Sequence, residues 1–373
     1  MTAIALLLSA AVFVLGALDA GTADSEARIA VEASADIMSV HDETAMLFGV
    51  IPLKKVSVTE FSGVKLCPGG MTFGVKLFTE GVVVVGFSEV DDAVGSRTPA
   101  YDAGIRANDR IITANGTKIA SCEDFAKAVS SGKPINVTYI RESIEEATVI
   151  TPSLSRADGS YKTGMWLKDS TSGIGTVTFI DPATGAFAGL GHGICDSGTG
   201  ELLPLGKGYV TGVTISGVVK GQSGAPGELK GYFDPGKTGV LLKNCDSGVY
   251  GVFADPVKCT GGAEPVGIAL KNEVTEGDAE IIASFEDEIP RRYSVKISHI
   301  DRTGTGNKSF VVTVTDPALI EKTGGIVQGM SGSPVIQGGK LIGAVTHVLI
   351  GDPTTGYGIF IENMLAGMPD ELR

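Results

Sequence analysis

What this sequence has little of already excludes several classes of protein. Its 373 residues include five cysteines and four histidines, and no two cysteines form a C-x-x-C pair. Five cysteines cannot all pair, and a structural zinc site usually needs C-x-x-C spacing, so neither a disulfide framework nor a structural zinc site is predicted. The chain also lacks runs of lysine or arginine and carries a net charge of −13. Because an acidic surface is repelled by phosphate groups, a nucleic-acid partner is not expected.

Long apolar runs are also scarce, and the longest stands at the N-terminus. Residues 3–18 read AIALLLSAAVFVLGAL, a segment shorter than the roughly 20 residues that span a bilayer comfortably. Such a run is typical of an export signal, cleaved or retained as an anchor. We therefore expect residues 1–20 to be a signal or membrane anchor and residues 21–71 to be a linker and lead-in. The rest of the chain is expected to lie outside the cytoplasm.

Glycine, in contrast, is abundant, with 52 residues or about twice the usual share. The glycines follow no three-residue period and stand among many Val, Ile and Thr residues, a composition of short strands and tight turns. Almost no segment shows the 3.6-residue period of a long helix. The sequence predicts a mainly β protein, with a small α+β unit over residues 72–152 and a strand-rich region, a β-barrel or a pair of barrels, over residues 155–373.

The small unit contains a motif at residues 98–119, TPAYDAGIRANDRIITANGTKI. Gly104 ends a short helix, Asp109 tightens the start of a strand, and Asn115-Gly116 makes a hairpin turn. The combination resembles PDZ domains, which bind extended peptide ends by adding a strand beside a groove. The resemblance places the groove strand at residues 74–78. The implied peptide-binding residues are Phe73, Gly74, Val75 and Leu77. The alternative is a unit that only packs against its neighbour.

The strand-rich region carries the pattern of a serine nucleophile in GMSGSP, residues 329–334. The glycines permit strained backbone angles, and the N–H groups of Gly329 and Ser331 are free to face a developing oxyanion. A hydroxyl is a poor nucleophile without a base. His192, placed between two glycines after an apolar strand, is the candidate base. The order of His before Ser is that of chymotrypsin-like enzymes.

A third group, a carboxylate, would orient the imidazole and stabilise its cation. Asp196, Asp301 and Asp316 each suit this role by position, and Asp316 follows a predicted strand over residues 310–314. Spacing alone leaves the choice open.

Three further stretches extend the resemblance. They are GIGTVTFIDPATGAFAGLGHGI (173–194), VTDPALIEKTGGIVQGMSGSP (314–334) and GAVTHVLIGDPTTGYGIFIENML (343–365). Together with the PDZ-then-peptidase order, they are similar to the stage IV sporulation protein B peptidase family. The resemblance implies a chymotrypsin-like double β-barrel and a triad of His192, Asp316 and Ser331. It implies no metal and no organic cofactor.

Four other residues near these motifs have side chains that suit a role in the site. Thr346 and His347 lie on the strand after the nucleophile, where such enzymes line the substrate pocket, so they are candidate substrate-binding residues. His347 is equally well explained as a core residue, because its neighbours are apolar. Ser333 is the alternative nucleophile. Cys195, three residues after His192, has no setting typical of a catalytic cysteine.

The resemblance also implies a biological role. We expect an exported serine endopeptidase in the space between forespore and mother cell, where it cleaves a membrane-anchored regulatory protein during sporulation. That cleavage would trigger processing of a late sigma factor precursor, and the enzyme would also cleave itself between about residues 21 and 71. The PDZ unit would bind a peptide or protein tail. The alternatives are a general envelope quality-control protease and a catalytically silent PDZ scaffold.

Overall fold

The computed structural model describes residues 39–47, 51–61, 63–198, 200–285 and 289–372. The apolar run expected to be a signal or anchor lies outside the described residues, and no helix within them is long and apolar enough to cross a membrane. The first described strands, β1 (Ser39–Leu47) and β2 (Ile51–Glu60), form an antiparallel hairpin.

Six antiparallel strands form the first barrel. The first and last of these six, β4 and β13, also pair with each other, which closes the ring. Around the ring the strands are β4 (Thr72–Phe87), β15 (Leu205–Thr211), β18 (Gly239–Cys245), β19 (Gly248–Phe253), β14 (Ala186–Gly189) and β13 (Met165–Ile180). Its interior is filled by stacked aromatic rings and aliphatic side chains, with the Phe187 and Phe253 centroids 4.3 Å apart. β3 (Lys65–Pro68) and β20 (Val266–Gly267) extend the sheet beyond β13.

The second barrel is also closed by six antiparallel strands. In ring order they are β21 (Gly277–Ala283), β22 (Arg291–Ser298), β23 (Phe310–Val314), β26 (Asp352–Phe360), β25 (Lys340–Leu349) and β24 (Pro334–Gln337). The helix α4 (Pro317–Thr323) follows β23. α5 (Ile361–Gly367) and the turn η1 (Asp370–Leu372) pack with residues of both barrels in one apolar cluster, which joins the barrels. Three further elements lie outside the rings: β16 (Val213–Val219) and β17 (Glu228–Phe233), which form a hairpin, and the helix α3 (Pro256–Thr260).

The small α+β unit has its own core, in which two helices pack on a short sheet. Its main elements are α1 (Pro99–Asp102), β7 (Arg110–Ala114), β8 (Thr117–Lys118), α2 (Cys122–Val129), β9 (Ile135–Arg141) and β10 (Ile144–Ile150). Two short pairs complete it: β5 (Val90–Asp91) with β6 (Ser96–Arg97), and β11 (Ser153–Leu154) with β12 (Tyr161–Lys162). The buried carboxylate of Asp109 is bound by Arg141 at 2.6 Å, which ties the start of β7 to the end of β9.

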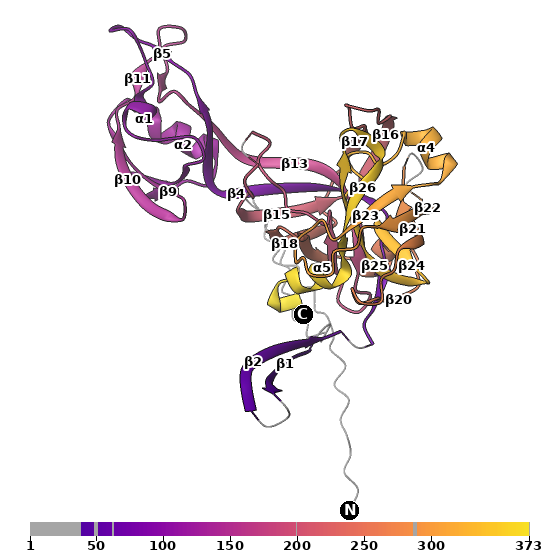
Figure 1. Ribbon diagram of the computed structural model, residues 1–373. Coiled ribbons are helices and arrows are strands. Elements are labelled where there is room, and N and C mark those ends of the chain that lie inside the picture. Colours follow the sequence, from indigo (N-terminus) through magenta and orange to yellow (C-terminus); the bar gives the residue numbers. More distant parts are fainter. Residues whose placement is uncertain (1–38, 48–50, 62, 199, 286–288, 373) are drawn as a thin grey trace, which may run out of the picture.

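β4 and β13 join this unit to the first barrel. Each has 16 residues, and they pair antiparallel from Met165–Phe87 at one end to Thr176–Thr72 at the other. Figure 1 shows the small unit at the far end of the two strands, away from the barrels. The unit is thus inserted into the first barrel. The expected boundary at residue 72 coincides with the first residue of β4, and the expected boundary at residue 155 lies before β13, so the domain limits stay a prediction.

The position of β4 corrects the peptide groove expected at residues 74–78. Phe73, Val75 and Leu77 are buried, and they lie on β4 of the first barrel. Gly74 is paired with Ile174 of β13 on one side and with Thr211 of β15 on the other. A peptide adds to a strand only through a free edge. Phe73, Gly74, Val75 and Leu77 therefore do not form a peptide-binding groove.

Candidate active site

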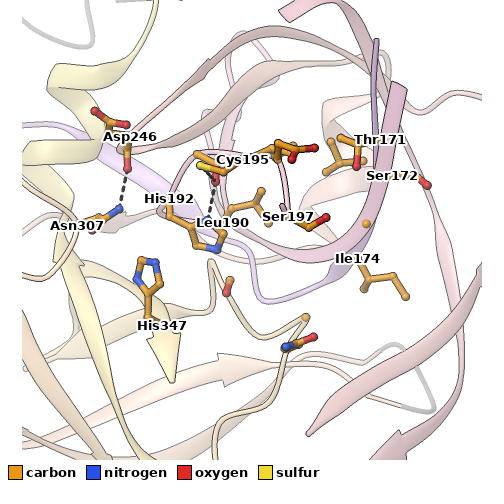
Figure 2. A pocket seen from close by; sticks show the side chains of 18 residues that line it. Thr171, Ser172, Ile174, Leu190, His192, Cys195, Ser197, Asp246, Asn307 and His347 are labelled. Carbon is orange, nitrogen blue, oxygen red and sulfur yellow. Dashed lines mark hydrogen bonds between the residues drawn. The ribbon is translucent and has the colours of Figure 1, made fainter. Parts of the chain in front are cut away.

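A cavity of about 610 Å³ lies where the two barrels meet. It is lined by His192 from the first barrel, by Ser331 and His347 from the second, and by residues 171–174 of β13. Figure 2 shows the imidazoles of His192 and His347 side by side in this cavity, with Asp246 and Asn307 to one side. The structure thus brings together the base and the nucleophile expected from the sequence, although they are 139 residues apart.

His192 follows β14 after two residues with left-handed backbone angles, Leu190 at φ 66° and Gly191 at φ 68°. This tight turn directs the imidazole into the cavity. Its Nδ1 lies 2.9 Å from the carbonyl oxygen of Gly193. Because a carbonyl can only accept, Nδ1 must donate, and the neutral ring then keeps Nε2 free as a base. Burial lowers the pKa of His192 below its usual value, partly offset by the bond to Gly193, so the ring is neutral at pH 7.

Ser331 stands in a turn between two glycines with left-handed backbone angles, Gly329 at φ 101° and Gly332 at φ 96°. Its hydroxyl donates to the carbonyl oxygen of Thr346 at 2.8 Å. The hydroxyl is therefore held in place by the second barrel rather than bonded to His192. A rotation about the Cα–Cβ bond of Ser331 changes this partner without moving the backbone.

The N–H groups of Gly329 and Ser331 donate to no acceptor within the described residues, although both residues line the cavity. The N–H groups of their neighbours are bonded: Met330 donates to Val327 and Gly332 donates to Val345. Two free donors on either side of Met330, beside a serine hydroxyl, are suited to stabilise an oxyanion. This is the arrangement that the glycine pattern of the sequence predicts.

Asp316 is placed differently from the expected triad. It does not line the cavity, and it caps the N-terminus of α4. Its carboxylate accepts from the N–H groups of Ala318 at 2.9 Å, Leu319 at 3.2 Å and Ser294 at 3.2 Å. An N-cap aspartate before Pro317 is the ordinary start of a helix. The structure thus contradicts a contact of Asp316 with His192, and within the described residues the polar partner of His192 Nδ1 is the Gly193 carbonyl.

The two candidates on β25 have different surroundings. Thr346 is buried and donates to the carbonyl oxygen of Asn307 at 2.8 Å, so its side chain does not reach the cavity, contrary to expectation. His347 lines the cavity, with its ring centroid 5.0 Å from that of His192. Burial, with smaller contributions from His192 and Lys308, lowers the pKa of His347 to about 4. A substrate-binding role for His347 stays a prediction.

Two other side chains that carry nucleophilic atoms are poorly placed for attack. Ser333 is fully buried, and its hydroxyl points into the protein without a partner. Cys195 does line the cavity, but burial and the charge of Asp246 raise the pKa of its thiol, so it stays protonated at neutral pH. Ser331 is therefore the nucleophile that the cavity presents.

A second cleft, of about 840 Å³, lies in the small unit between α2 and the start of β13. Cys122, Phe125 and Ala126 line one wall, and residues 161–167 line the other. Met165, Trp166 and Leu167 pair with β4 through one edge, and the opposite edge pairs with no described strand. This strand was not predicted from the sequence. The signal that could have revealed it is Gly164, a glycine at φ 79° directly before the apolar residues 165–167.

Two closed barrels with a serine and a histidine at their junction define a serine peptidase of chymotrypsin-like architecture. The family model of the SpoIVB peptidase S55 matches residues 159–365, more than half of the chain, and a PDZ-domain model matches residues 59–151. The chain therefore belongs to the SpoIVB peptidase family and is a serine endopeptidase with a PDZ domain.

Individual relatives match shorter parts of the chain. A putative zinc metalloprotease of Lactococcus lactis subsp. lactis is 32% identical over 129 residues, which are 33% of this chain and 27% of that protein. This chain thus spans about a quarter of that relative's length. The Rv3671c protease of M. tuberculosis, in its active form, is 14% identical with a TM-score of 0.32, covering 52% of this chain and 72% of the other. The HtrA-type protease AlgW with a decapeptide is 13% identical with a TM-score of 0.32, covering 55% and 54%.

Proposed function

We propose that Ser331 attacks the scissile carbonyl and that Nε2 of His192 takes the hydroxyl proton as the general base. The N–H groups of Gly329 and Ser331 stabilise the tetrahedral oxyanion. His192 then gives its proton to the leaving amine, and water hydrolyses the acyl-enzyme by the same route in reverse. The observation that carries this proposal is the meeting of His192, Ser331 and the two free N–H groups in one cavity.

The carbonyl oxygen of Gly193 supplies part of what a triad carboxylate supplies elsewhere. It holds the proton on Nδ1 of His192 at 2.9 Å, which fixes the tautomer in which Nε2 is basic. A neutral carbonyl stabilises the imidazolium less than a carboxylate does. The proposed reaction is therefore slower than one with a full triad.

A fluorophosphonate probe tests the catalytic proposal on the full-length chain. The expected result is a covalent label on Ser331, located by peptide mass spectrometry. The label should be lost in Ser331→Ala and slowed at least about 100-fold in His192→Ala. Ser333→Ala is the matched control and should label like the wild type, because its hydroxyl is buried outside the cavity. A folded protein that takes no label would support the silent scaffold instead.

We further propose that the enzyme is exported, remains associated with the membrane, and cleaves a membrane-anchored regulatory protein during sporulation. Membership of the SpoIVB peptidase family and the apolar N-terminal run support this role. The cleavage releases processing of a late sigma factor precursor in the space between forespore and mother cell. The enzyme also cleaves itself between about residues 21 and 71.

Sporulating cells carrying Ser331→Ala should leave the sigma factor precursor unprocessed, while cells carrying Ser333→Ala should process it. N-terminal sequencing of the purified enzyme should find new ends between residues 21 and 71 in the wild type and none in Ser331→Ala. Sustained digestion of casein, with normal sigma factor processing in Ser331→Ala cells, would favour a general envelope protease.

The edge of Met165–Leu167 is, we propose, where the PDZ unit receives a protein tail. An extended peptide added there lies between β13 and α2, with its side chains in the cleft. Trp166, the single tryptophan of the chain, lines this cleft and is well exposed, so its fluorescence reports binding.

Peptides with a free apolar C-terminus should change the fluorescence of Trp166. Ala126→Arg fills the cleft and should weaken binding at least about tenfold, the loss of a central contact. Lys127→Ala, outside the cleft, should not.

A further inference from the structure

A single residue of β13, Thr176, lies between the loop of the nucleophile and the loop of the base. Its hydroxyl donates to the carbonyl oxygen of Gly329 at 2.7 Å, and its N–H donates to the carbonyl oxygen of Ser331 at 2.9 Å. Its own carbonyl oxygen accepts from the N–H of Leu190 at 3.2 Å, two residues before His192. Thr176 is therefore bonded to both loops, which come from different barrels.

Thr178, two residues further along β13, makes a parallel contact. Its hydroxyl donates to the carbonyl oxygen of Gly332 at 2.8 Å. Both threonines are almost completely buried, so no water competes for these carbonyls. The two hydroxyls thus hold the glycines on either side of Ser331 from the opposite barrel.

The glycines are where such support is needed. Gly329 and Gly332 have the backbone freedom that an oxyanion-binding turn requires, and the same freedom allows the turn to adopt other conformations. The N–H groups of Met330 and Gly332 fix part of this turn, and its carbonyl groups supply the remaining contacts. Thr176 and Thr178 bond those carbonyls, while the N–H groups of Gly329 and Ser331 stay free.

We propose that Thr176 and Thr178 are positioning residues of the catalytic centre, which hold the oxyanion-binding turn in its working conformation from across the barrel junction. This inference rests on the proposed function of Ser331. Neither threonine lines the cavity, so Thr176 acts through the turn and through Leu190, and Thr178 acts through the turn. Their loss should therefore slow the chemical step and leave binding of the reagent almost unchanged.

Thr176→Val tests the proposal because it removes the hydroxyl and keeps the backbone contacts. Fluorophosphonate inactivation, followed against probe concentration, separates the limiting rate from the half-saturating concentration. Loss of one oxyanion donor costs about 100- to 1,000-fold in rate, so a misplaced turn should cost about 10- to 100-fold. The half-saturating concentration should stay within about threefold. Thr176→Ser restores a hydroxyl and should restore most of the rate.

Thr79→Val is the matched control on β4. Its hydroxyl is also buried and also donates to a main-chain carbonyl, that of Gly81 at 2.7 Å, but it contacts neither catalytic loop. Its inactivation rate should equal that of the wild type. An equal loss of rate in Thr79→Val and Thr176→Val, or a wild-type rate in Thr176→Val, would overturn the inference.

Two further outcomes remain decisive. If Thr176→Val does not fold, Thr178→Val carries the test, with a rate loss of the same order expected and a wild-type rate overturning the inference. If the folded wild-type chain takes no label at Ser331, both the proposed function and the inference fail. A labelled wild type with unimpaired threonine variants refutes the inference alone.

Discussion

β4 and β13 are similar in length and course, yet they contribute differently to function. Both run from the PDZ unit into the first barrel and pair with each other. β4 is bordered by β13 on one side and, over most of its length, by β15 or β7 on the other. β13 pairs with no other described strand before Val177, and its residues line first the cleft proposed to bind peptides and then the cavity of Ser331 and His192. An unpaired edge, rather than composition, distinguishes the functional strand.

The largest expected effect is on the β13 side, at Gly332→Ala. A Cβ at Gly332 would meet the main chain of Thr176 and Leu190, and its φ of 96° is unfavourable for alanine. The turn must move away from β13, so labelling of Ser331 by fluorophosphonate should fall by about 100-fold or more. Gly338→Ala has a similar backbone strain, at φ 57°, with open space around it, and should label normally. Normal labelling of Gly332→Ala would show that β13 does not determine the turn.

The corresponding change on β4 should affect stability alone. Phe73 is buried against Phe187, with ring centroids 6.0 Å apart. Phe73→Ala should lower the free energy of unfolding by about 3–5 kcal/mol, measured by denaturant titration. The fluorescence response of Trp166 to a peptide should be unchanged in the folded variant. A weakened response would mean that β4 takes part in peptide binding.

How much of this comparison was predictable differs between its parts. His192 and Ser331 were predictable because each lies between glycines, a local pattern that the chemistry requires. The PDZ motif at residues 98–119 was predictable because its turns are also local. The peptide groove was expected at β4 because both β4 and β13 contain apolar residues that come after a glycine. Only the strand pairing of the folded chain shows which of the two strands has a free edge.

The third catalytic member was not predictable for a related reason. Asp316 precedes Pro317 at the start of a helix, a pattern that a cap and a triad aspartate share. The family resemblance favoured the triad, whereas the geometry gives the carboxylate three backbone donors on its own helix and on β22. The contacts of Thr176 could not be foreseen either, since its partners are 153 and 155 residues away in the sequence.

A smaller effect is expected at Asp316, away from both long strands. Asp316→Ala leaves N–H groups of α4 and β22 without their acceptor, so the free energy of unfolding should fall by about 1–2 kcal/mol. Asp316→Asn keeps an acceptor oxygen and should cost less. Denaturant titration of the two variants measures the difference. Equal stability of Asp316→Ala and the wild type would mean that the cap contributes nothing and that the carboxylate is free for another role.

The smallest expected effect is a shift in the pH at which the labelling rate falls on the acid side of its pH profile. Burial lowers the pKa of His192 below its usual value of about 6.5. A base works when it is neutral, so the acid limb of the rate of fluorophosphonate labelling should have its midpoint below pH 6.5. His347, with a pKa of about 4, is neutral over most of the pH range above that value, so a single limb is expected.

Opening the cavity wall by a truncation on β13, as in Ile174→Ala, hydrates His192 and should move the limb upward toward 6.5. Truncation of β4 at Val83, which does not line the cavity, should leave the limb in place. A limb above pH 7 in the wild type would mean that His192 is stabilised as a cation, as by a carboxylate that approaches it in the working enzyme.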